Sequence, residues 1–467
     1  MDRTTGCIEG LGLDPRIVSF LRDKWGIEEL FPPQIEALPN ALEGRNLMLT
    51  IPTASGKSLV AYLAMLHRLS GDLSGSRGLY IVPLKALASE KVGELQEIAA
   101  SIGLSVGIAI GDRGSENVGV NDADIIVCTS EKLDSMLRTN RDLLNKIGVV
   151  VSDEFHLLND NSRGPTLEVL ISRIRHEKPD AQIIALSATV GNAESLAEWL
   201  DADLVISEWR PVSLHCGVMN NLEIRVHRIE GEEPSEWPSE RKLGGKKNKS
   251  LQAVLDDTVS SGGQLLVFVS SRASAQKEAR ELSEHVLNTM KSGDGKYFSQ
   301  SDETWMGFSS KINKGEESSS VGKSLSNSIK GGVAFHHAGL TSSQRRVIEG
   351  AFREGSLNCI VATPTLAQGV NLPARRVVIR DYRRWNTAAS ASMPLPIMEI
   401  RQMMGRAGRP KYDERGDSWI IAKDVQEEER LVDLYLKGGS EDVISKLASP
   451  MALRAIEDPA LLTHCLS

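Results

Sequence analysis

The chain has few cysteines, no long hydrophobic run and no excess of positive charge. Five of its 467 residues are cysteine, and they are scattered, without a Cys-x-x-Cys pair or a nearby histidine at metal-ligand spacing. Isolated buried thiols are therefore expected, and a zinc or iron–sulfur site is not. No apolar run reaches the roughly 18 residues that cross a bilayer, and residues 1–6 lack a basic segment followed by an apolar one. We expect a cytoplasmic protein with no membrane partner.

The net charge of −8 argues against a protein that coats nucleic acid by bulk attraction. A local basic channel remains compatible with this charge, because phosphate contacts depend on where the lysines and arginines lie. At 467 residues the chain is too long for one compact core, so two or three domains are expected. Its hydrophobic content of 41% and charged content of 25% are those of an ordinary folded protein.

Short apolar segments alternate with amphipathic ones over most of the chain, a pattern typical of βαβ units around parallel sheets. In the first half, the expected strands are 46–51, 78–82, 124–128, 148–151 and 182–186. In the second half, they are 264–269, 332–336, 357–362, 376–380 and 417–422. The pattern therefore predicts an α/β protein with two tandem domains.

Changes in composition indicate where these domains end. The pattern breaks near 208–212, which predicts a first domain over 1–208 and a second over 209–426. Within the second domain, the polar stretch 290–331 predicts a flexible insertion that has room for short helices, and 230–250 predicts a surface loop. Helices are expected over 427–436, 441–447 and 450–466. The last of them has an unpaired apolar face, so 427–467 is expected to begin a further domain of a longer protein.

A phosphate-binding loop is indicated between the first predicted strand and the helix after it. Its residues are Pro52, Thr53, Ala54, Ser55 and Gly56, followed by Lys57 and Ser58. Backbone N–H groups of such a loop point at phosphate oxygens, Lys57 adds a positive charge, and the Ser58 hydroxyl can ligate Mg²⁺. The full pattern has glycine where this chain has Ile51. A chance Gly-Lys-Ser turn is the alternative.

A pair of carboxylates, Asp153 and Glu154, follows the predicted strand 148–151. This places the pair at the carboxyl end of a parallel sheet, where ligands bind. There Asp153 can hold Mg²⁺, and Glu154 can polarise the water that attacks a phosphate. The alternative is a pair that caps the next helix. The phosphate loop upstream favours the catalytic interpretation.

Further segments occur in the order that one family shows. They are 31–34 (Q motif), 83–87 (Ia), 129–132 (Ib), 187–189 (III), 268–272 (IV), 363–373 (V) and 402–410 (VI). Together with Asp-Glu-x-His at 153–156 and the stretch 335–340, this set resembles the superfamily 2 DExH-box helicases of the Ski-two-like group. Within the group, the chain is most similar to the archaeal Hjm/Hel-type DNA repair helicases.

The resemblance implies two RecA-like domains that bind ATP and Mg²⁺ and close on them, with the start of a winged-helix domain after them. Gln34 would bind the adenine edge, unless it is only a turn residue. Arg406 and Arg409, three apart on one helical face, would act as arginine fingers, or else lie on a basic helix facing solvent. Gln402 is implied as catalytic, and Gly369 and Asn371 as ATP-binding. Coupling to nucleic acid would involve His156, Ser187 and Thr189, for which helix capping is the alternative.

Nucleic acid would lie across both domains, held by its phosphates and so without sequence preference. The candidate contacts are Lys85, Thr129, Ser130, Arg272, Thr363, Thr365, Arg383, Arg384 and Trp385. Ordinary turn chemistry is the alternative for the polar ones. The family has a strand-separating β-hairpin where this chain has 380–397. The two prolines and the Ala- and Ser-rich middle of that stretch favour a plain surface loop as a competing interpretation.

These features together predict an ATP-dependent DNA helicase or translocase. By resemblance it would move three-prime to five-prime on single-stranded or branched DNA and act in DNA repair or fork processing, as a monomer. A Ski-type RNA helicase is one alternative, since the motor motifs barely distinguish the two sugars. The other is a nucleic-acid-binding scaffold with a decayed ATP site, against which Lys57, Asp153 and Glu154 argue.

Overall fold

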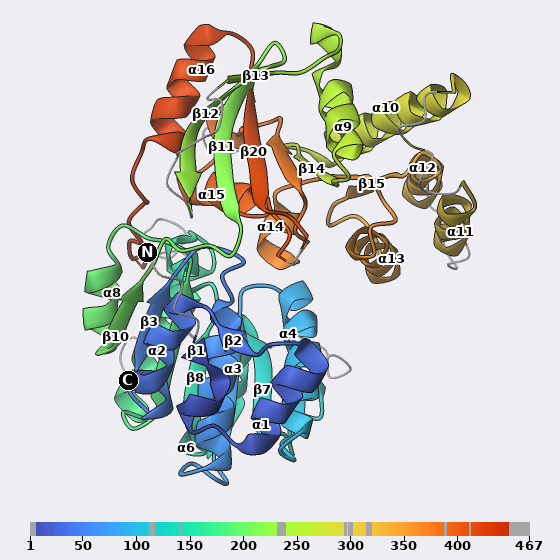
Figure 1. Cartoon of the computed structure of the whole chain (residues 1–467). Coiled ribbons are helices and arrows are strands. Elements are labelled where there is room, and N and C mark those ends of the chain that lie inside the picture. The colour runs from blue at the N-terminus through green and yellow to red at the C-terminus, as the bar shows by residue number, and fades with distance from the viewer. Residues whose placement is uncertain are drawn as a thin grey trace. The chain divides into compact units, whose positions relative to one another are not determined.

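The computed structural model of the chain describes residues 6–111, 117–140, 142–230, 240–293, 297, 302–313, 320–370, 372–386, 390–410 and 412–447. The chain divides into two compact units. The first comprises Met1–Trp209 and Ser440–Ser467, and the second comprises Arg210–Gly439. Figure 1 shows a β-sheet with flanking helices in each unit. The prediction of two tandem α/β domains built on parallel sheets is therefore confirmed.

The described residues of the first unit form an eight-stranded sheet. In sheet order its strands are Asp203–Ile206 (β10), Leu47–Thr50 (β3), Gln182–Ser187 (β9), Ile147–Ser152 (β8), Arg77–Val82 (β4), Ile125–Thr129 (β7), Val106–Ala109 (β5) and Asn117–Val118 (β6). Neighbouring strands are parallel, except that β6 is antiparallel to β5. The central strands are buried along their whole length because helices cover both faces of a parallel sheet.

Helices connect these strands in chain order. They are Pro15–Phe20 (α1), Pro32–Leu42 (α2), Lys57–Ser70 (α3), Lys85–Ala100 (α4), Ser130–Thr139 (α5), Asp142–Asn145 (α6), Gly164–Glu177 (α7) and Ala193–Leu200 (α8). Two short strands near the N-terminus, Gly6–Cys7 (β1) and Glu29–Leu30 (β2), pair with each other. Because α3 and α4 each begin just after a parallel strand, their N-termini lie at the carboxyl edge of the sheet.

The described residues of the second unit also form an eight-stranded sheet. In sheet order its strands are Glu240–Lys242 (β13), Glu223–Glu230 (β12), Ser213–Asn220 (β11), Arg415–Ala422 (β20), Arg376–Ile379 (β17), Leu265–Phe268 (β14), Cys359–Ala362 (β16) and Val333–His336 (β15). Strands β11 to β15 in this order are parallel, whereas β12 and β13 are antiparallel additions at one edge. The sequence prediction did not include β5, β6 and β10 of the first sheet or β11, β12 and β13 of the second.

The helices of the second unit follow a similar scheme. They are Ser250–Ser260 (α9), Arg272–Lys291 (α10), Asp302–Asn313 (α11), Ser320–Ile329 (α12), Ser342–Arg353 (α13), Thr365–Gly369 (α14), Ile397–Met404 (α15) and Val425–Leu431 (α16). A π-helical turn, Val432–Leu436 (η7), extends α16. Leu431, Val432, Tyr435 and Leu436 belong to the hydrophobic core of this unit.

Two predictions about the less regular segments need correction. The predicted flexible insertion 290–331 contains α11 and α12, and Trp305, Leu325 and Ile329 from it are fully buried in the core. Its Trp305 indole donates a hydrogen bond to the Ser356 carbonyl, at 2.8 Å. The predicted surface loop 230–250 contributes β13 to the sheet, while 231–239 lie outside the described residues. Apolar residues spaced along a polar stretch were the overlooked signal.

The C-terminal segment also differs from its prediction. Residues 427–436 are helical but pack into the second unit instead of starting a further domain, because their apolar face covers β11 and β12. Residues 441–447 are irregular, not helical, and belong to the first unit, where the Val443 N–H donates to Asn192 Oδ1 at 2.8 Å. The predicted helix 450–466 lies outside the described residues.

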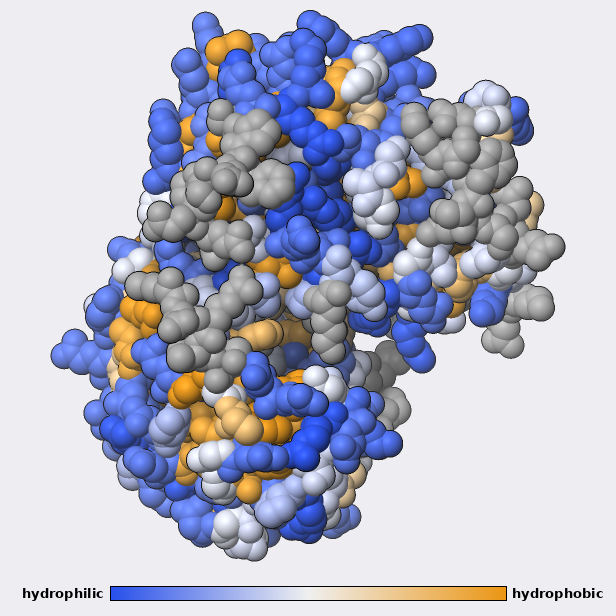
Figure 2. Space-filling model, viewed as in Figure 1, coloured by the Kyte–Doolittle hydropathy of each residue, from blue (hydrophilic) through white to orange (hydrophobic). Residues whose placement is uncertain are grey.

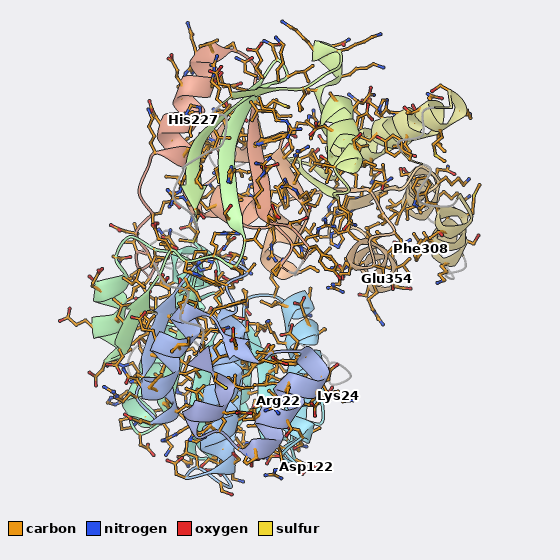
Figure 3. The ribbon with its side chains drawn as sticks, in the orientation of Figure 1. Arg22, Lys24, Asp122, His227, Phe308 and Glu354 are labelled. Atoms are coloured by element: carbon orange, nitrogen blue, oxygen red, sulfur yellow. The ribbon has the colours of Figure 1, made fainter. Side chains whose placement is uncertain are left out.

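The surface of the described residues is mostly hydrophilic, with scattered hydrophobic groups on the first unit (Figure 2). Figure 3 labels Arg22 and Lys24, which are exposed on the first unit, and His227 on β12; none belongs to a predicted site. No helix in the described ranges is long and apolar enough to span a membrane. Cys128, Cys216 and Cys359 are buried as expected, but Cys7 is exposed, and Cys465 lies outside the described residues.

Candidate functional site

The predicted phosphate loop lies between β3 and α3 in the first unit. Ala54 and Gly56 adopt left-handed backbone conformations, with φ of 67° and 78°, and α3 begins directly afterwards at Lys57. The loop therefore turns sharply and presents N–H groups near a helix N-terminus, an arrangement that suits phosphate. Ser55 is buried, and its hydroxyl donates to the Trp209 carbonyl at 3.1 Å, which anchors the loop. Pro52, Thr53 and Ala54 remain partly exposed.

The side chain of Gln34 makes two hydrogen bonds, one of which holds this loop. Its side-chain Oε1 accepts a hydrogen bond from the Phe31 N–H at 2.8 Å, and its Nε2 donates to the Gly56 carbonyl at 2.9 Å. Gly56 is required at its position, because a Cβ there would lie 2.3 Å from Gln34 Nε2 and φ is left-handed. Gln34 is thus more than the turn residue considered as its alternative. One proton of its amide group is not used by these two bonds.

Two aromatic residues flank the same loop and were not among the predicted site residues. The rings of Phe31 and Trp209 lie with their centroids 4.7 Å apart. Phe31 is the N-cap of α2, and Trp209 follows β10, so the two come from distant parts of the first unit. Aromatic rings next to a phosphate loop provide a flat apolar surface that can stack on a nucleotide base. The position of Phe31 as the first residue of the Q motif was the available signal.

Asp153 directly follows β8 and is buried, with both carboxylate oxygens engaged. Oδ1 accepts from the Glu154 N–H at 2.9 Å, and Oδ2 accepts from the Tyr80 hydroxyl at 3.0 Å. Burial and the neighbouring Glu154 raise the pKa of Asp153, while Lys91 and Lys57 oppose that rise. The carboxylate is therefore fixed in orientation, although its remaining lone pairs can still accept from a ligand.

Glu154 sits at the centre of the catalytic candidates. Its backbone is left-handed, with φ of 51°, a conformation that costs energy for a residue other than glycine and often marks a functional turn. The turn brings Glu154 Oε2 to 3.3 Å from Lys57 Nζ and 3.4 Å from His156 Nε2. The structure thus unites Lys57, Asp153 and Glu154, which come from segments about a hundred residues apart.

His156 connects Glu154 to motif III. Its Nδ1 accepts from the Ala188 N–H at 3.3 Å and lies 3.4 Å from Ser187 Oγ. Burial, reinforced by Lys57, lowers the pKa of His156 to about 4 in spite of the opposing effect of Glu154. The ring is therefore neutral at pH 7, with its proton on Nε2, where it can donate to Glu154. Thr189, the third coupling candidate, is partly exposed next to this link.

We predict a pH-dependent contribution of His156 to stability. In the unfolded chain its pKa is that of a free histidine, 6.5, and in the fold it is about 4, so the unfolded state binds more protons between these values. The stabilisation is then complete above pH 6.5 and is lost as the pH falls towards 4. Between pH 7 and pH 5, the free energy of unfolding should fall by about 2 kcal/mol more in the wild type than in His156→Gln. Urea titrations of both proteins at both pH values measure the free energy of unfolding. An equal decrease in the wild type and in His156→Gln would contradict this prediction.

The donor atoms at this site fit Mg²⁺. Ser58 on α3 and Asp153 after β8 both offer oxygen, the ligand type that Mg²⁺ prefers. Within the described ranges, no cluster of three or more His, Cys, Asp or Glu side chains could hold a metal by itself. Mg²⁺ is commonly held by one or two protein oxygens together with substrate phosphates. The residues present therefore suit an ion that arrives with a nucleotide.

A buried lysine, Lys91, lies beside the two predicted metal ligands. Its Nζ donates to Ser58 Oγ at 3.1 Å and to Glu94 Oε2 at 3.0 Å. Burial acts to lower the pKa of Lys91, but Glu94 and Asp153 outweigh it and the pKa is raised, so the charge is retained. Sequence reasoning missed Lys91. The signal was its spacing of four residues from Leu87 and Leu95, which places a charge on the buried face of α4.

The predicted nucleic-acid contacts of the first unit differ in their exposure. Lys85 is exposed at the first position of α4. Thr129 is the N-cap of α5 and is buried, with its Oγ1 accepting from the Lys132 N–H at 3.4 Å. Ser130 is also buried. Any contact that Thr129 or Ser130 makes with phosphate would therefore involve the backbone of the helix start, not the side chains.

In the second unit, the predicted contacts lie on three separate elements. Arg272 is exposed at the first position of α10. Thr363 is buried, Thr365 is exposed at the start of α14, and their hydroxyl oxygens are 3.0 Å apart. Gly369 ends α14, and Asn371 lies outside the described residues.

The segment 380–397 contains two paired β-strands among its described residues. Arg383–Asn386 (β18) pairs with Ala391–Pro394 (β19) in antiparallel register. The plain loop considered from the two prolines is therefore excluded: Pro394 closes β19 at the edge of a two-stranded ribbon, where a missing N–H is tolerated. Arg383, Arg384 and Trp385 are exposed on β18, Trp385 by 65%. Such a ribbon presents the Trp385 ring and the Arg383 side chain to solvent, while Arg384 NH1 forms an ion pair with Glu399 Oε1 at 3.1 Å.

Arg406 and Arg409 do not share a helical face, contrary to prediction. Helix α15 ends at Met404, and both arginines follow it in a turn. Gly408 makes that turn possible, since its φ is 92° and a Cβ would lie 2.7 Å from Val212 Cγ1. Gln402, the remaining motif VI candidate, is buried on α15.

The two arginines also differ in their partners. Arg409 forms a bidentate pair with Asp413, with Nε–Oδ2 and NH2–Oδ1 distances of 2.8 Å, and its NH1 donates to Gln264 Oε1 at 3.1 Å. Its guanidinium group is thus occupied inside the unit. Arg406 is buried and donates to the Ala367 carbonyl in motif V. Of the two, Arg406 is the better candidate for a role in catalysis.

Comparison with known proteins agrees with this geometry. Residues 31–196 match the family model described as DEAD/DEAH box helicase, and residues 296–411 match that of the helicase conserved C-terminal domain. The chain belongs to the superfamily 2 helicases. The match to the DEAD/DEAH box model begins at Phe31 of the Q motif, and the match to the C-terminal domain model ends just after Pro410 of motif VI.

This helicase chain is similar to curated archaeal proteins. It is 42% identical over 439 residues to the ATP-dependent DNA helicase Hel308 of Methanocella arvoryzae, covering 92% of this chain and 56% of that protein. It is 39% identical to Hel308 of Pyrococcus horikoshii and 40% identical to that of Pyrococcus abyssi, covering 96% and 95% of this chain and 58% of each relative. The chain thus spans a little more than half the length of these relatives.

Proposed function

We propose that the chain is the motor part of an ATP-dependent DNA helicase that moves three-prime to five-prime along single-stranded DNA and acts in DNA repair. The proposal rests chiefly on one observation: Lys57, Asp153 and Glu154 converge beside a phosphate loop at the carboxyl edge of the first sheet. Likeness to relatives named as ATP-dependent DNA helicases supports the choice of ATP and DNA. The site in the first unit argues against a decayed scaffold.

In this proposal, the loop 52–56 and Lys57 bind the phosphates of ATP, and Phe31 or Trp209 stacks on the base. Ser58 and Asp153 hold Mg²⁺, which offsets the negative charge of the phosphates. Glu154 orients the attacking water and accepts its proton, while neutral His156 holds the carboxylate through Nε2. Arg406 stabilises charge that develops on the transferred phosphoryl group. Gln402, Gly369 and Asn371 complete the proposed nucleotide contacts.

The proposed contacts with DNA are of two kinds. Lys85, Arg272 and Thr365 are exposed at helix starts, where N–H groups and side chains together suit phosphate. The hairpin β18–β19 offers Trp385 for stacking and Arg383 and Arg384 for phosphates. Contacts of these kinds carry no sequence information, so binding is expected to be independent of sequence.

Nucleic-acid-stimulated ATP turnover by the full chain tests this function. Turnover should rise on addition of single-stranded DNA, rise less with RNA of the same sequence, and be lost in Lys57→Ala. Duplexes with a three-prime or a five-prime single-stranded tail then test the direction of movement. Turnover that no nucleic acid stimulates would refute the motor. Stronger stimulation by RNA would favour the Ski-type RNA helicase instead.

A further inference from the structure

Each of the two predicted metal ligands of the first unit is hydrogen-bonded to a further buried side chain. Ser58 lies on α3 and Asp153 follows β8, so the chain itself does not connect them closely. Lys91 from α4 contacts Ser58, and Tyr80 from β4 contacts Asp153. We call Lys91, Ser58, Tyr80 and Asp153 the Ser58–Asp153 network.

Two hydrogen bonds reach the predicted metal ligands from these buried side chains. Lys91 Nζ donates to Ser58 Oγ at 3.1 Å. The Tyr80 hydroxyl donates to Asp153 Oδ2 at 3.0 Å. Each predicted metal ligand therefore has a hydrogen-bond donor that comes from outside the predicted motifs.

The fold explains why these groups meet. Strand β4 lies next to β8, with Tyr80 opposite Val151, and the Asp153 N–H donates to the Ile81 carbonyl at 2.9 Å. Tyr80 is fully buried in an otherwise apolar strand, and a buried phenol requires a hydrogen-bond partner. Lys91 is held from the other side by Glu94, which also accepts from the Tyr62 hydroxyl.

The Ser58 hydroxyl has one lone pair available to coordinate a further ligand. A serine hydroxyl has one proton and two lone pairs. One lone pair is used by Lys91, so the other remains for a further ligand. At Asp153, the Tyr80 hydroxyl and the Glu154 N–H fix the two oxygens in the same way. Ser58 and Asp153 are thereby oriented before a nucleotide or a cation binds.

We propose that Tyr80 and Lys91 are positioning residues that preorganise Ser58 and Asp153 for the divalent cation bound with the nucleotide. The inference rests on the proposed function, since it assumes that this loop binds a nucleotide with Mg²⁺. It adds two residues outside the predicted motifs and assigns them to cation binding, not to contact with the nucleotide. Groups that orient metal ligands in this way commonly change metal affinity about 10- to 100-fold when they are removed.

The test separates binding of the nucleotide from binding of the cation. A fluorescent ADP derivative is bound to the full chain in EDTA and then during titration with Mg²⁺, so no turnover is required. In Tyr80→Phe, nucleotide affinity in EDTA should stay within about twofold of that of the wild type. The Mg²⁺ concentration that gives half of the maximal increase in nucleotide binding should rise about tenfold. Lys91→Met, which removes the donor to Ser58, should shift the Mg²⁺ dependence in the same direction.

A matched control and a double variant sharpen the test. Tyr62→Phe removes a neighbouring buried hydroxyl that bonds Glu94, so its Mg²⁺ dependence should resemble that of the wild type. The double variant of Tyr80→Phe and Lys91→Met should shift Mg²⁺ dependence by more than either single variant, because Tyr80 orients Asp153 and Lys91 orients Ser58. A purely structural role would instead lower stability and leave the Mg²⁺ midpoint unchanged.

The possible outcomes distinguish this inference from the function on which it rests. If the wild type binds no nucleotide under any condition, the proposed function fails and the inference fails with it. If the wild type responds to Mg²⁺ and both Tyr80→Phe and Lys91→Met retain its midpoint, only the inference is overturned. Equal weakening of nucleotide binding with and without Mg²⁺ would overturn it as well, since that result places Tyr80 and Lys91 in nucleotide binding.

Discussion

Replacement of Glu154 by glutamine should lower the turnover number of ATP hydrolysis by about 10²- to 10⁴-fold, the range that a general base supplies. Glutamine has the size of glutamate but cannot accept the proton of the attacking water. The Lys57 and His156 contacts with Oε2, at 3.3 and 3.4 Å, would also lose their charged partner. Steady-state turnover with saturating DNA measures the effect.

Nucleotide affinity should change far less in this variant, because Glu154 is assigned to the reaction and not to binding of the phosphates. Glu97→Gln is the matched control: it removes a carboxylate from the exposed side of α4, where Glu97 accepts from the Trp25 indole. Its turnover should equal that of the wild type. A Glu154→Gln protein with turnover within about tenfold of the wild type would exclude the general-base role.

Arg406 and Arg409 should respond in different ways to replacement by alanine. Arg406→Ala should lower the turnover number by about 10³-fold, at the lower end of what an arginine finger supplies. Arg409→Ala should lower the free energy of unfolding by about 3 kcal/mol, because it leaves the buried Asp413 carboxylate without its bidentate partner. Turnover measurements and urea titrations on both variants separate the two effects.

Arg280→Ala provides a control for both experiments, since Arg280 is exposed on α10, lies outside the predicted sites and makes only a surface contact of 4.0 Å with Glu284. Arg406→Lys retains the charge but not the planar donor group, so it should recover only part of the turnover. A large loss of turnover in Arg409→Ala at full stability would reverse the assignment. It would mean that Arg409 leaves Asp413 during the catalytic cycle.

Most strands of both sheets were predictable because a parallel sheet covered by helices requires continuous apolar segments. The predicted segments 78–82 and 182–186, for example, correspond to β4 and β9 within one residue at each end. Strand β12 is half exposed and lacks the continuous apolar segment by which the other strands were predicted, although its polar and apolar residues partly alternate as in a half-buried strand. It is joined to β11 by Asn221 and Leu222, whose left-handed φ of 49° and 71° is unusual for a turn that lacks glycine.

Helices α11 and α12 show a different limit of sequence reasoning. Their composition resembles that of a polar loop, yet Trp305 and a few apolar residues anchor them to the core. Burial of a handful of large side chains can order a segment whose average hydropathy is low, because each contributes about 1.5–3 kcal/mol. The average composition of a segment does not reveal which single side chains will be buried.

The sequence by itself determined the two α/β domains, the phosphate loop and the carboxylate pair, because these depend on local order: an apolar strand followed at once by polar residues. The tertiary structure alone decided what those residues touch. It placed Glu154 between Lys57 and His156, paired Arg409 with Asp413, and brought Lys91 to Ser58 and Tyr80 to Asp153. The physical reason is that such contacts join strands and helices that are adjacent in the sheet and distant in the chain, and local patterns carry no record of that adjacency.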